Sequence, residues 1–103
     1  MKTMYGDIPS KQISNYKKIL HNKIHWLLIY KERDYAELDK YFYYLLKKIS
    51  SLNKIFNYQP EIIDLLCILQ TARDLSINSD FDFKEYRKLI FDAHSAVDRI
   101  KES

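Results

Sequence analysis

The histidines at positions 21 and 25 are the pair in this sequence that most directly suggests chemistry. A spacing of four residues places two imidazoles on one face of a helix, where both can bind the same metal ion. No glutamate stands beside His21, as it does in zinc-protease helices, and no third ligand completes the set. If Leu20 faces the core, both histidines point away from it. We therefore expect no metal site and no cofactor.

Arg87 and His94 form a second candidate pair, separated by six residues near the C-terminal end. Their spacing resembles the arginine–histidine spacing of the HEPN ribonucleases, which are also small helical bundles. The polar residue usual directly after the arginine is replaced here by Lys88. His94 is also one helical turn from Asp98, which makes an ordinary i,i+4 pair. We expect these residues to lie on solvated helix faces and the protein not to be an enzyme.

The acidic residues and the cysteine offer no clear catalytic arrangement. Asp34, Glu37 and Asp39 cluster at an expected helix start, where the helix dipole favours negative charge. Asp64 interrupts the apolar run 62–69 and is either a buried acid or, as we favour, the polar edge of a mostly buried helix. Cys67 lies in the same run, which predicts a buried thiol. A single cysteine excludes an intramolecular disulfide and favours a reducing cytoplasm.

Composition and charge indicate a folded domain with an uneven charge distribution. The chain has 103 residues, of which 47% are apolar and 15% aromatic, as expected for one folded domain. Its apolar runs fall short of the roughly 20 residues that a membrane span needs, and we see no secretory segment. Residues 1–58 carry a net charge of +6 and residues 59–103 a net charge of −3. The two halves either complement each other within one bundle or attract an acidic partner.

Apolar residues recur at alternating spacings of three and four, the pattern of helices that pack against neighbouring helices. One series comprises Tyr35, Leu38, Phe42, Leu45, Ile49, Leu52 and Phe56. A second comprises Phe83, Tyr86, Ile90, Ala93, Val97 and Ile100. A third, nearer the N-terminus, comprises Ile13, Tyr16, Leu20, Ile24 and Leu27.

Start signals divide the chain into four helices at about 10–31, 35–56, 60–77 and 83–101. Asp34 with Glu37 has capping-box spacing, Pro60 suits a first helical turn, and Asp82 with Glu85 caps the last helix. Because no helix breaker lies in 31–33, a continuous helix over 10–56 is the alternative. Matched lengths and short links predict an all-α, single-domain, up-down-up-down four-helix bundle, with the run 62–69 in its most buried helix.

Aromatic residues exceed what one buried face can hold. Tyr41, Phe42, Tyr43 and Tyr44 are consecutive, so they point all round their helix. With Phe42 buried, Tyr41 can flank the core while Tyr43 and Tyr44 face outward. Folding the first two helices together brings Trp26 into the same half of the bundle. We expect a contiguous exposed aromatic patch, which is typical of interaction sites; the alternative is a wide core that absorbs these side chains.

Binding to a protein partner, or to a second copy, is the function that these features favour. The expected contact residues are the aromatic Trp26, Tyr41, Tyr43 and Tyr44 and the basic Lys17, Lys18 and Lys23. In size, helical bundle and basic balance, the chain is similar to the immunity proteins against pediocin-type bacteriocins, a likeness that implies an immunity role. The alternatives are nonspecific nucleic-acid binding through lysines and tyrosines and peripheral contact with a membrane surface. No small-molecule substrate is expected.

Overall fold

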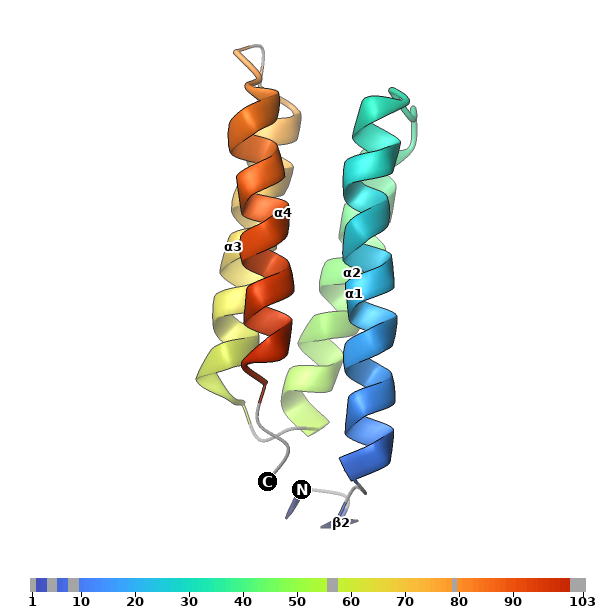
Figure 1. The fold of residues 1–103 in the computed structure, drawn as a ribbon, viewed down its shortest axis with the longest axis vertical. Helices are drawn as coiled ribbons and strands as arrows, with labels where there is room; N and C mark the ends of the chain where they lie inside the picture. The colour runs from blue at the N-terminus through green and yellow to red at the C-terminus, as the bar shows by residue number, and fades with distance from the viewer. Residues whose placement is uncertain (1, 4–5, 8–9, 56–57, 79, 101–103) are drawn as a thin grey trace.

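Four helices account for almost all of the computed structural model, which describes residues 2–3, 6–7, 10–55, 58–78 and 80–100 (Figure 1). They are α1 Ser10–Glu32, α2 Leu38–Ile55, α3 Pro60–Ser76 and α4 Phe83–Asp98. The predicted all-α class with four helices is confirmed for the described part of the chain. One addition was not predicted: ahead of α1, the two-residue strands β1 Lys2–Thr3 and β2 Gly6–Asp7 pair antiparallel.

The helices lie alongside one another in an elongated body of 45 × 20 × 18 Å (Figure 1). Helix α4 packs against α1 and α3, and α2 packs against α3 and, over a smaller contact, α1. Each helix therefore has two principal neighbours, and the apolar stripes meet in a common core. The side of each helix that points away from both neighbours is available to solvent.

Helices α1 and α2 are separate, because the chain takes a left-handed turn between them. Asp34 has a φ angle of 53°, the backbone N–H of Tyr35 donates to the Tyr30 carbonyl at 2.9 Å, and that of Asp34 donates to the Lys31 carbonyl at 3.2 Å. This is the Schellman pattern that ends a helix. The predicted role of Asp34 as an N-cap is therefore wrong, and α2 begins at Leu38 rather than at 35.

The signals at the starts of α3 and α4 act as predicted. Pro60 occupies the first turn of α3. The carboxylate of Asp82 accepts a hydrogen bond of 2.9 Å from the Lys84 backbone N–H at the start of α4. The ring of Phe81 packs on Tyr86, with 5.6 Å between centroids, as a hydrophobic staple requires.

The core consists largely of the predicted stripes. Its buried members on α1 and α2 are Ile13, Leu20, Ile24, Leu27, Leu28, Leu38, Phe42, Leu45, Ile49 and Leu52. The series on α4 is buried from Tyr86 to Ile100, whereas Phe83 is half-buried. Tyr35 is exposed because the interhelical turn holds it outside α2. Phe56, the last expected member of its series, lies outside the described residues.

Helix α3 departs from the expectation that it is buried on nearly all sides. Its buried face is Ile62, Leu65, Leu69, Ala72 and Ser76. Ile63 is 45% exposed, and Cys67 is exposed rather than buried. The reason is geometric, because α3 has principal neighbours on only two sides. Asp64 lies in the solvent, as the favoured interpretation predicted.

Candidate functional site

The two tyrosines expected to face outward do so. Tyr43 is 59% exposed and Tyr44 is 58% exposed, and their rings meet edge to face with 5.7 Å between centroids. They do not share one hollow, however. Tyr43 lies on the α3 side of α2, and Tyr44 lies on the α1 side. The outward face of α2 is therefore a ridge with an aromatic side chain on each flank.

The hollow beside Tyr43 is a groove between α2 and α3 with a volume of about 530 Å³. Its lining residues are Tyr43, Leu46, Lys47, Ser50, Leu66, Cys67, Gln70 and Arg73. Leu46 and Leu66 are half-buried and pack on the core, so they form the apolar floor. Tyr43, Ser50 and Cys67 are exposed and form the walls. A groove with an apolar floor and polar rim suits an apolar side chain supplied by a partner.

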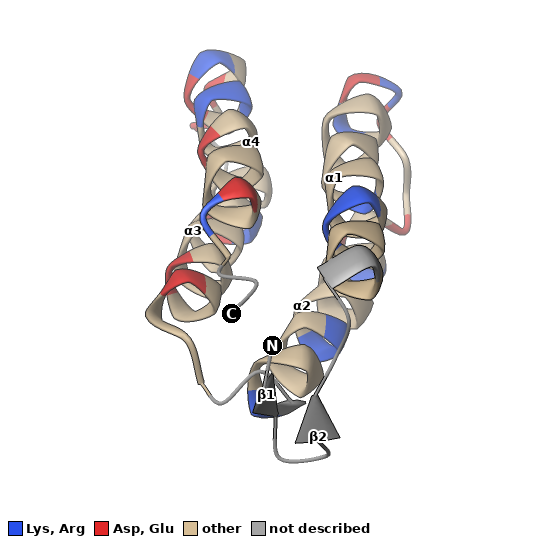
Figure 2. Cartoon of the chain, turned by 60° about the horizontal axis from the view of Figure 1, so that its bottom comes forward, with Lys and Arg blue, Asp and Glu red and all other residues tan. Residues whose placement is uncertain are grey.

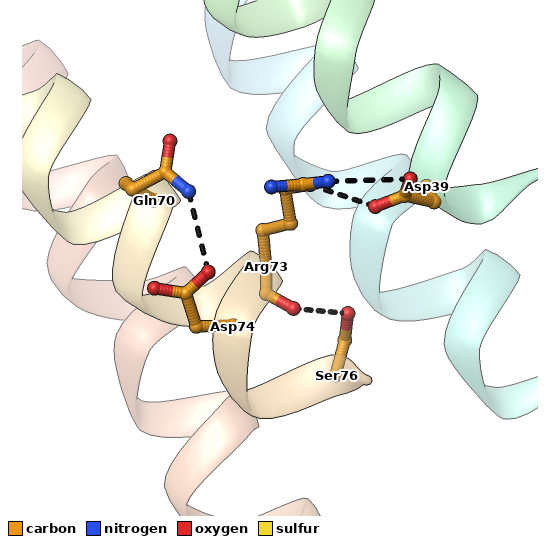
Figure 3. Close-up of polar contacts among 5 residues, drawn as sticks. All are labelled: Asp39, Gln70, Arg73, Asp74 and Ser76. Carbon is orange, nitrogen blue, oxygen red and sulfur yellow. Dashed lines mark hydrogen bonds and ion pairs between the residues drawn. The ribbon is translucent and has the colours of Figure 1, made fainter. Parts of the chain in front are cut away.

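One end of this groove is closed by an ion pair between α3 and α2 (Figure 3). The Arg73 guanidinium donates from Nε to Asp39 Oδ1 at 2.7 Å and from Nη2 to Asp39 Oδ2 at 3.3 Å. These hydrogen bonds hold the pKa of Asp39 below its usual value. On the same turns of α3, Gln70 donates to Asp74 at 3.3 Å, and the Ser76 hydroxyl donates to the Arg73 carbonyl at 2.7 Å.

The hollow beside Tyr44 is smaller, about 100 Å³, and lies between α1 and α2. It is lined by Lys23, Tyr41, Tyr44, Leu45 and Lys48. The Tyr41 hydroxyl donates to the Lys23 carbonyl at 2.7 Å, and burial raises the pKa of Tyr41 to about 12. Tyr41 was expected among the contact residues, but it joins α1 to α2. Its half-buried position agrees with the expectation that it flanks the core, and its role as a contact residue stays a prediction.

Trp26 belongs to a cluster of aromatic rings centred on Tyr30. Its ring packs on Tyr30, with centroids 5.3 Å apart, and Tyr30 in turn contacts Tyr35 and Tyr41. Trp26 is 36% exposed, so it offers only part of its surface. Tyr41 belongs to this cluster and also lines the hollow beside Tyr44, so the cluster adjoins the Tyr43–Tyr44 pair.

Both signs of charge occur around the interhelical turn, so the net positive charge of the first half comes from the rest of α1 and α2. Figure 2 shows the acidic residues of α1 and α2 at the end where these helices connect, and they are Glu32 and Asp39. Residues 40–55 contain four lysines and no acid. Among the lysines expected to bind a partner, Lys18 is exposed, Lys23 is half-buried, and Lys17 donates to the Asp98 carbonyl at 3.3 Å.

Three histidines meet on the other side of the molecule, between α1 and α4. The Nδ1 atoms of His21 and His94 are 2.7 Å apart, and His21 Nε2 lies 2.7 Å from Asp98 Oδ1. The ring centroid of His25 is 6.2 Å from that of His94. The sequence suggested two unrelated pairs, His21 with His25 and Arg87 with His94. No local signal joins positions 21 and 94, because only the packing of α1 on α4 brings them together.

Two chemical roles were considered from the sequence: a metal site at His21 and His25, and an arginine–histidine pair at Arg87 and His94. No group of three or more His, Cys, Asp or Glu side chains in the described residues is arranged to hold a metal ion. Arg87 lies over the ring of Phe91, with 5.6 Å from its guanidinium carbon to the centroid, while His94 faces His21. Phe91 also lies beside His94, with 6.4 Å between ring centroids, so the arginine and the histidine are neighbours of the same ring.

Comparison with known proteins adds no relative: no family model, curated protein or solved structure matches this chain. Within the described ranges, none of the helices is both long and apolar enough to cross a membrane.

Proposed function

We propose that this chain is a non-enzymatic protein-binding module that engages its partner through α2 and the groove between α2 and α3. The observation that carries the proposal is the 530 Å³ groove with Tyr43, 59% exposed, on its wall. A tyrosine at the edge of an apolar groove presents a large area with little rotamer entropy and keeps a polar tip for hydrogen bonding. Such residues are enriched among the anchors of protein interfaces.

The charges of α2 favour an acidic partner. Lys40, Lys47 and Lys54 recur every seven residues on the exposed side of the helix, and Lys47 also lines the groove. Asp39, the acid of α2, is bonded to Arg73. A segment with apolar residues on one face and carboxylates beside it therefore complements the groove and its lysine rim.

The same lysines disfavour a second copy as the partner. A symmetric dimer through α2 places the same patch of two copies face to face. Lys40, Lys47 and Lys54 of one copy then meet those of the other, and like charges across an interface oppose association. We therefore propose a different, acidic protein rather than self-association.

We also propose that the four helices form an up-down-up-down antiparallel bundle. The short connections 33–37 and 77–82, and the packing of α1 on α2 and of α3 on α4, support this arrangement. We further propose a cytoplasmic location. An exposed free thiol at Cys67 stays reduced in that compartment, which supports the assignment.

The test is capture of a partner from native lysate, followed by calorimetry with the purified partner at physiological salt. The double substitution Tyr43→Ser with Tyr44→Ser should weaken binding at least 30-fold, since an interface anchor contributes about 2 kcal/mol or more. Its control is Phe91→Ser, which removes an aromatic ring that is 49% exposed on α4. Lys47→Glu should also weaken binding, whereas Lys88→Glu, at an exposed position on α4, should not.

The proposal requires that the captured protein be acidic and that both α2 variants lose it while both α4 variants keep it. A double tyrosine variant that melts at a much lower temperature yet still binds would show that these rings stabilise the fold instead. Capture of nucleic acid that salt releases, with no protein partner, would favour the nucleic-acid alternative.

A further inference from the structure

We infer that a hydrogen bond between His21 and His94, which we call the histidine clasp, joins α1 to α4 and depends on the protonation of the two rings. The bond forms when both rings are neutral or when one of them is positively charged, and it breaks when both are positively charged. The inference is independent of the proposed partner-binding function, because it concerns the opposite pair of helices. It rests on the short contact between the two rings and on the carboxylate that fixes one of them.

The protonation of His21 follows from its neighbours. A carboxylate oxygen accepts hydrogen bonds, so His21 Nε2, 2.7 Å from Asp98 Oδ1, carries a proton. In neutral His21 the other nitrogen, Nδ1, is then an acceptor. The Nδ1 of His94, 2.7 Å away, must therefore be the donor.

One additional proton leaves this contact intact. If it resides on His21, Nδ1 of His21 donates and Nδ1 of neutral His94 accepts; if it resides on His94, Nδ1 of His94 donates. A second proton gives both Nδ1 atoms a hydrogen, and no acceptor remains between them. It also places two positive charges in nearly parallel rings whose centroids are 4.9 Å apart. The doubly protonated pair must separate.

On balance, the surroundings of His94 disfavour its protonation. Burial and the proximity of His21 and His25 on α1 lower the pKa of His94, while Asp98 on α4 opposes this shift. Lys17 of α1 adds a cation beside the Asp98 carbonyl. Arg87, on the same helix as His94, lies over Phe91, whose ring is 6.4 Å from that of His94. The charged groups that shift the pKa of His94 therefore lie on α1 and α4.

The expected consequence is that acid loosens α1 from α4. In the unfolded chain His94 takes up a proton near its ordinary pKa of 6.5. In the folded protein it remains neutral to lower pH, so the stabilising contribution is complete above pH 6.5 and is lost as pH falls below it. The residues adjacent to the pair, Leu20 and Ala93, belong to the buried core. Separation of the rings therefore weakens packing at the α1–α4 contact.

The first test measures the unfolding equilibrium in urea between pH 7.5 and 5.0. Each proton that the unfolded state binds in excess changes the unfolding constant by up to tenfold per pH unit. His94→Asn places an uncharged amide near the position of Nδ1, where it can donate or accept a hydrogen bond. Because the amide takes up no proton, the variant should lose the part of the pH dependence of unfolding that protonation of His94 contributes. His25→Asn is the matched control, because His25 lies in the same cluster and on the same face of α1 as His21. Because His25 is a smaller cause of the lowered pKa of His94 than burial or His21, this variant should keep most of the pH dependence of the unsubstituted protein.

The second test reads the ring protons directly by nitrogen NMR of the imidazoles at pH 8. The clasp requires hydrogen on Nε2 of His21 and on Nδ1 of His94. It also requires that amides near positions 21 and 94 lose protection on acidification, measured against the intrinsic exchange rate at each pH, and that His94→Asn abolish this effect. Hydrogen on Nε2 of His94 at pH 8 would overturn the inference. So would an unchanged pH dependence of unfolding in His94→Asn.

Discussion

Asp39 on α2 and Arg73 on α3 are joined by two hydrogen bonds, of 2.7 and 3.3 Å, across the end of the groove. This bond pair fixes the spacing of the two helices where α2 begins. It also neutralises the acid that would otherwise repel an acidic partner.

We predict that Asp39→Asn makes unfolding less sensitive to acid. The lowered pKa of Asp39 means that its stabilising contribution is present above the unfolded pKa, near 4, and is lost as pH falls through the folded value. Urea titrations at pH 7 and pH 3 should show a smaller difference for the variant than for the unsubstituted protein. Both side chains are solvent-exposed, so added salt should diminish the effect. An equal acid sensitivity in the two proteins contradicts this prediction.

The buried stripe of α2 should dominate its stability. Leu45→Ala or Ile49→Ala should each cost about 2–5 kcal/mol in the free energy of unfolding, because each leaves a cavity at a position at most 3% exposed. Lys40→Ala and Lys54→Ala, on the exposed side of the same helix, should change it by less than about 0.5 kcal/mol. Urea melts of all four variants provide the comparison, and equal sensitivity of the two sets would refute this helix register.

Tyr86→Phe should destabilise the protein by about 1 kcal/mol. The Tyr86 hydroxyl donates at 2.8 Å to the Leu27 carbonyl, and this buried bond links α4 to α1. Burial raises the pKa of Tyr86, so its stabilising contribution is lost as pH rises past about 10, where the unfolded side chain ionises. Urea melts at pH 7 and pH 10.5 should show a weaker alkaline loss in the variant. Tyr43→Phe, at an exposed position, is the control. It should leave the free energy of unfolding at pH 7, and its decrease at pH 10.5, nearly unchanged.

Asp34→Gly should stabilise the turn between α1 and α2. Asp34 has a φ angle of 53°, a region that costs most residues about 1–2 kcal/mol and glycine little. Glycine also adds entropy to the unfolded chain, so the expected net gain is about 0.5 kcal/mol. A thermal melt should show a raised midpoint. Lys88→Gly, inside α4, should instead lower the midpoint, and a fall in both variants would argue against strain at Asp34.

Any binding of this protein to nucleic acid should be weak and strongly dependent on salt. Lys31, in the last turn of α1, donates to the Ser76 carbonyl at 2.9 Å and lies 4.4 Å from the centroid of the Phe81 ring, so it is directed toward the protein. Lys17 also bonds within the fold. Affinity for single strands, measured by fluorescence anisotropy, should collapse between low and physiological salt. Sequence-selective binding at high salt would contradict this expectation.

The positions of the helices were predictable because the signals that specify a helix lie in neighbouring residues of the sequence. The three-and-four spacing placed Phe42, Leu45 and Ile49 correctly in the core, and the Asp82 cap was recognisable from its own neighbours. The exposure of Cys67 was not predictable from the same kind of evidence. An apolar run shows which side chains avoid water, but how many helices surround the run depends on the tertiary packing.

The contacts that define the candidate sites depend on that packing even more strongly. Asp39 and Arg73 are 34 positions apart, and His21 and His94 are 73 apart. Each pair joins ordinary polar residues whose spacing carries no periodic signal. These contacts can be predicted only when the rotation and axial position of the two packed helices are known.

The exposed thiol of Cys67 gives the groove a natural attachment point for a reporter. It is the single cysteine in the sequence, and it lines the groove together with Tyr43 and Gln70. A thiol-reactive dye therefore labels one position without any substitution. Because that position lies against the apolar floor, the colour and intensity of an environment-sensitive dye will change when another molecule displaces water from the groove.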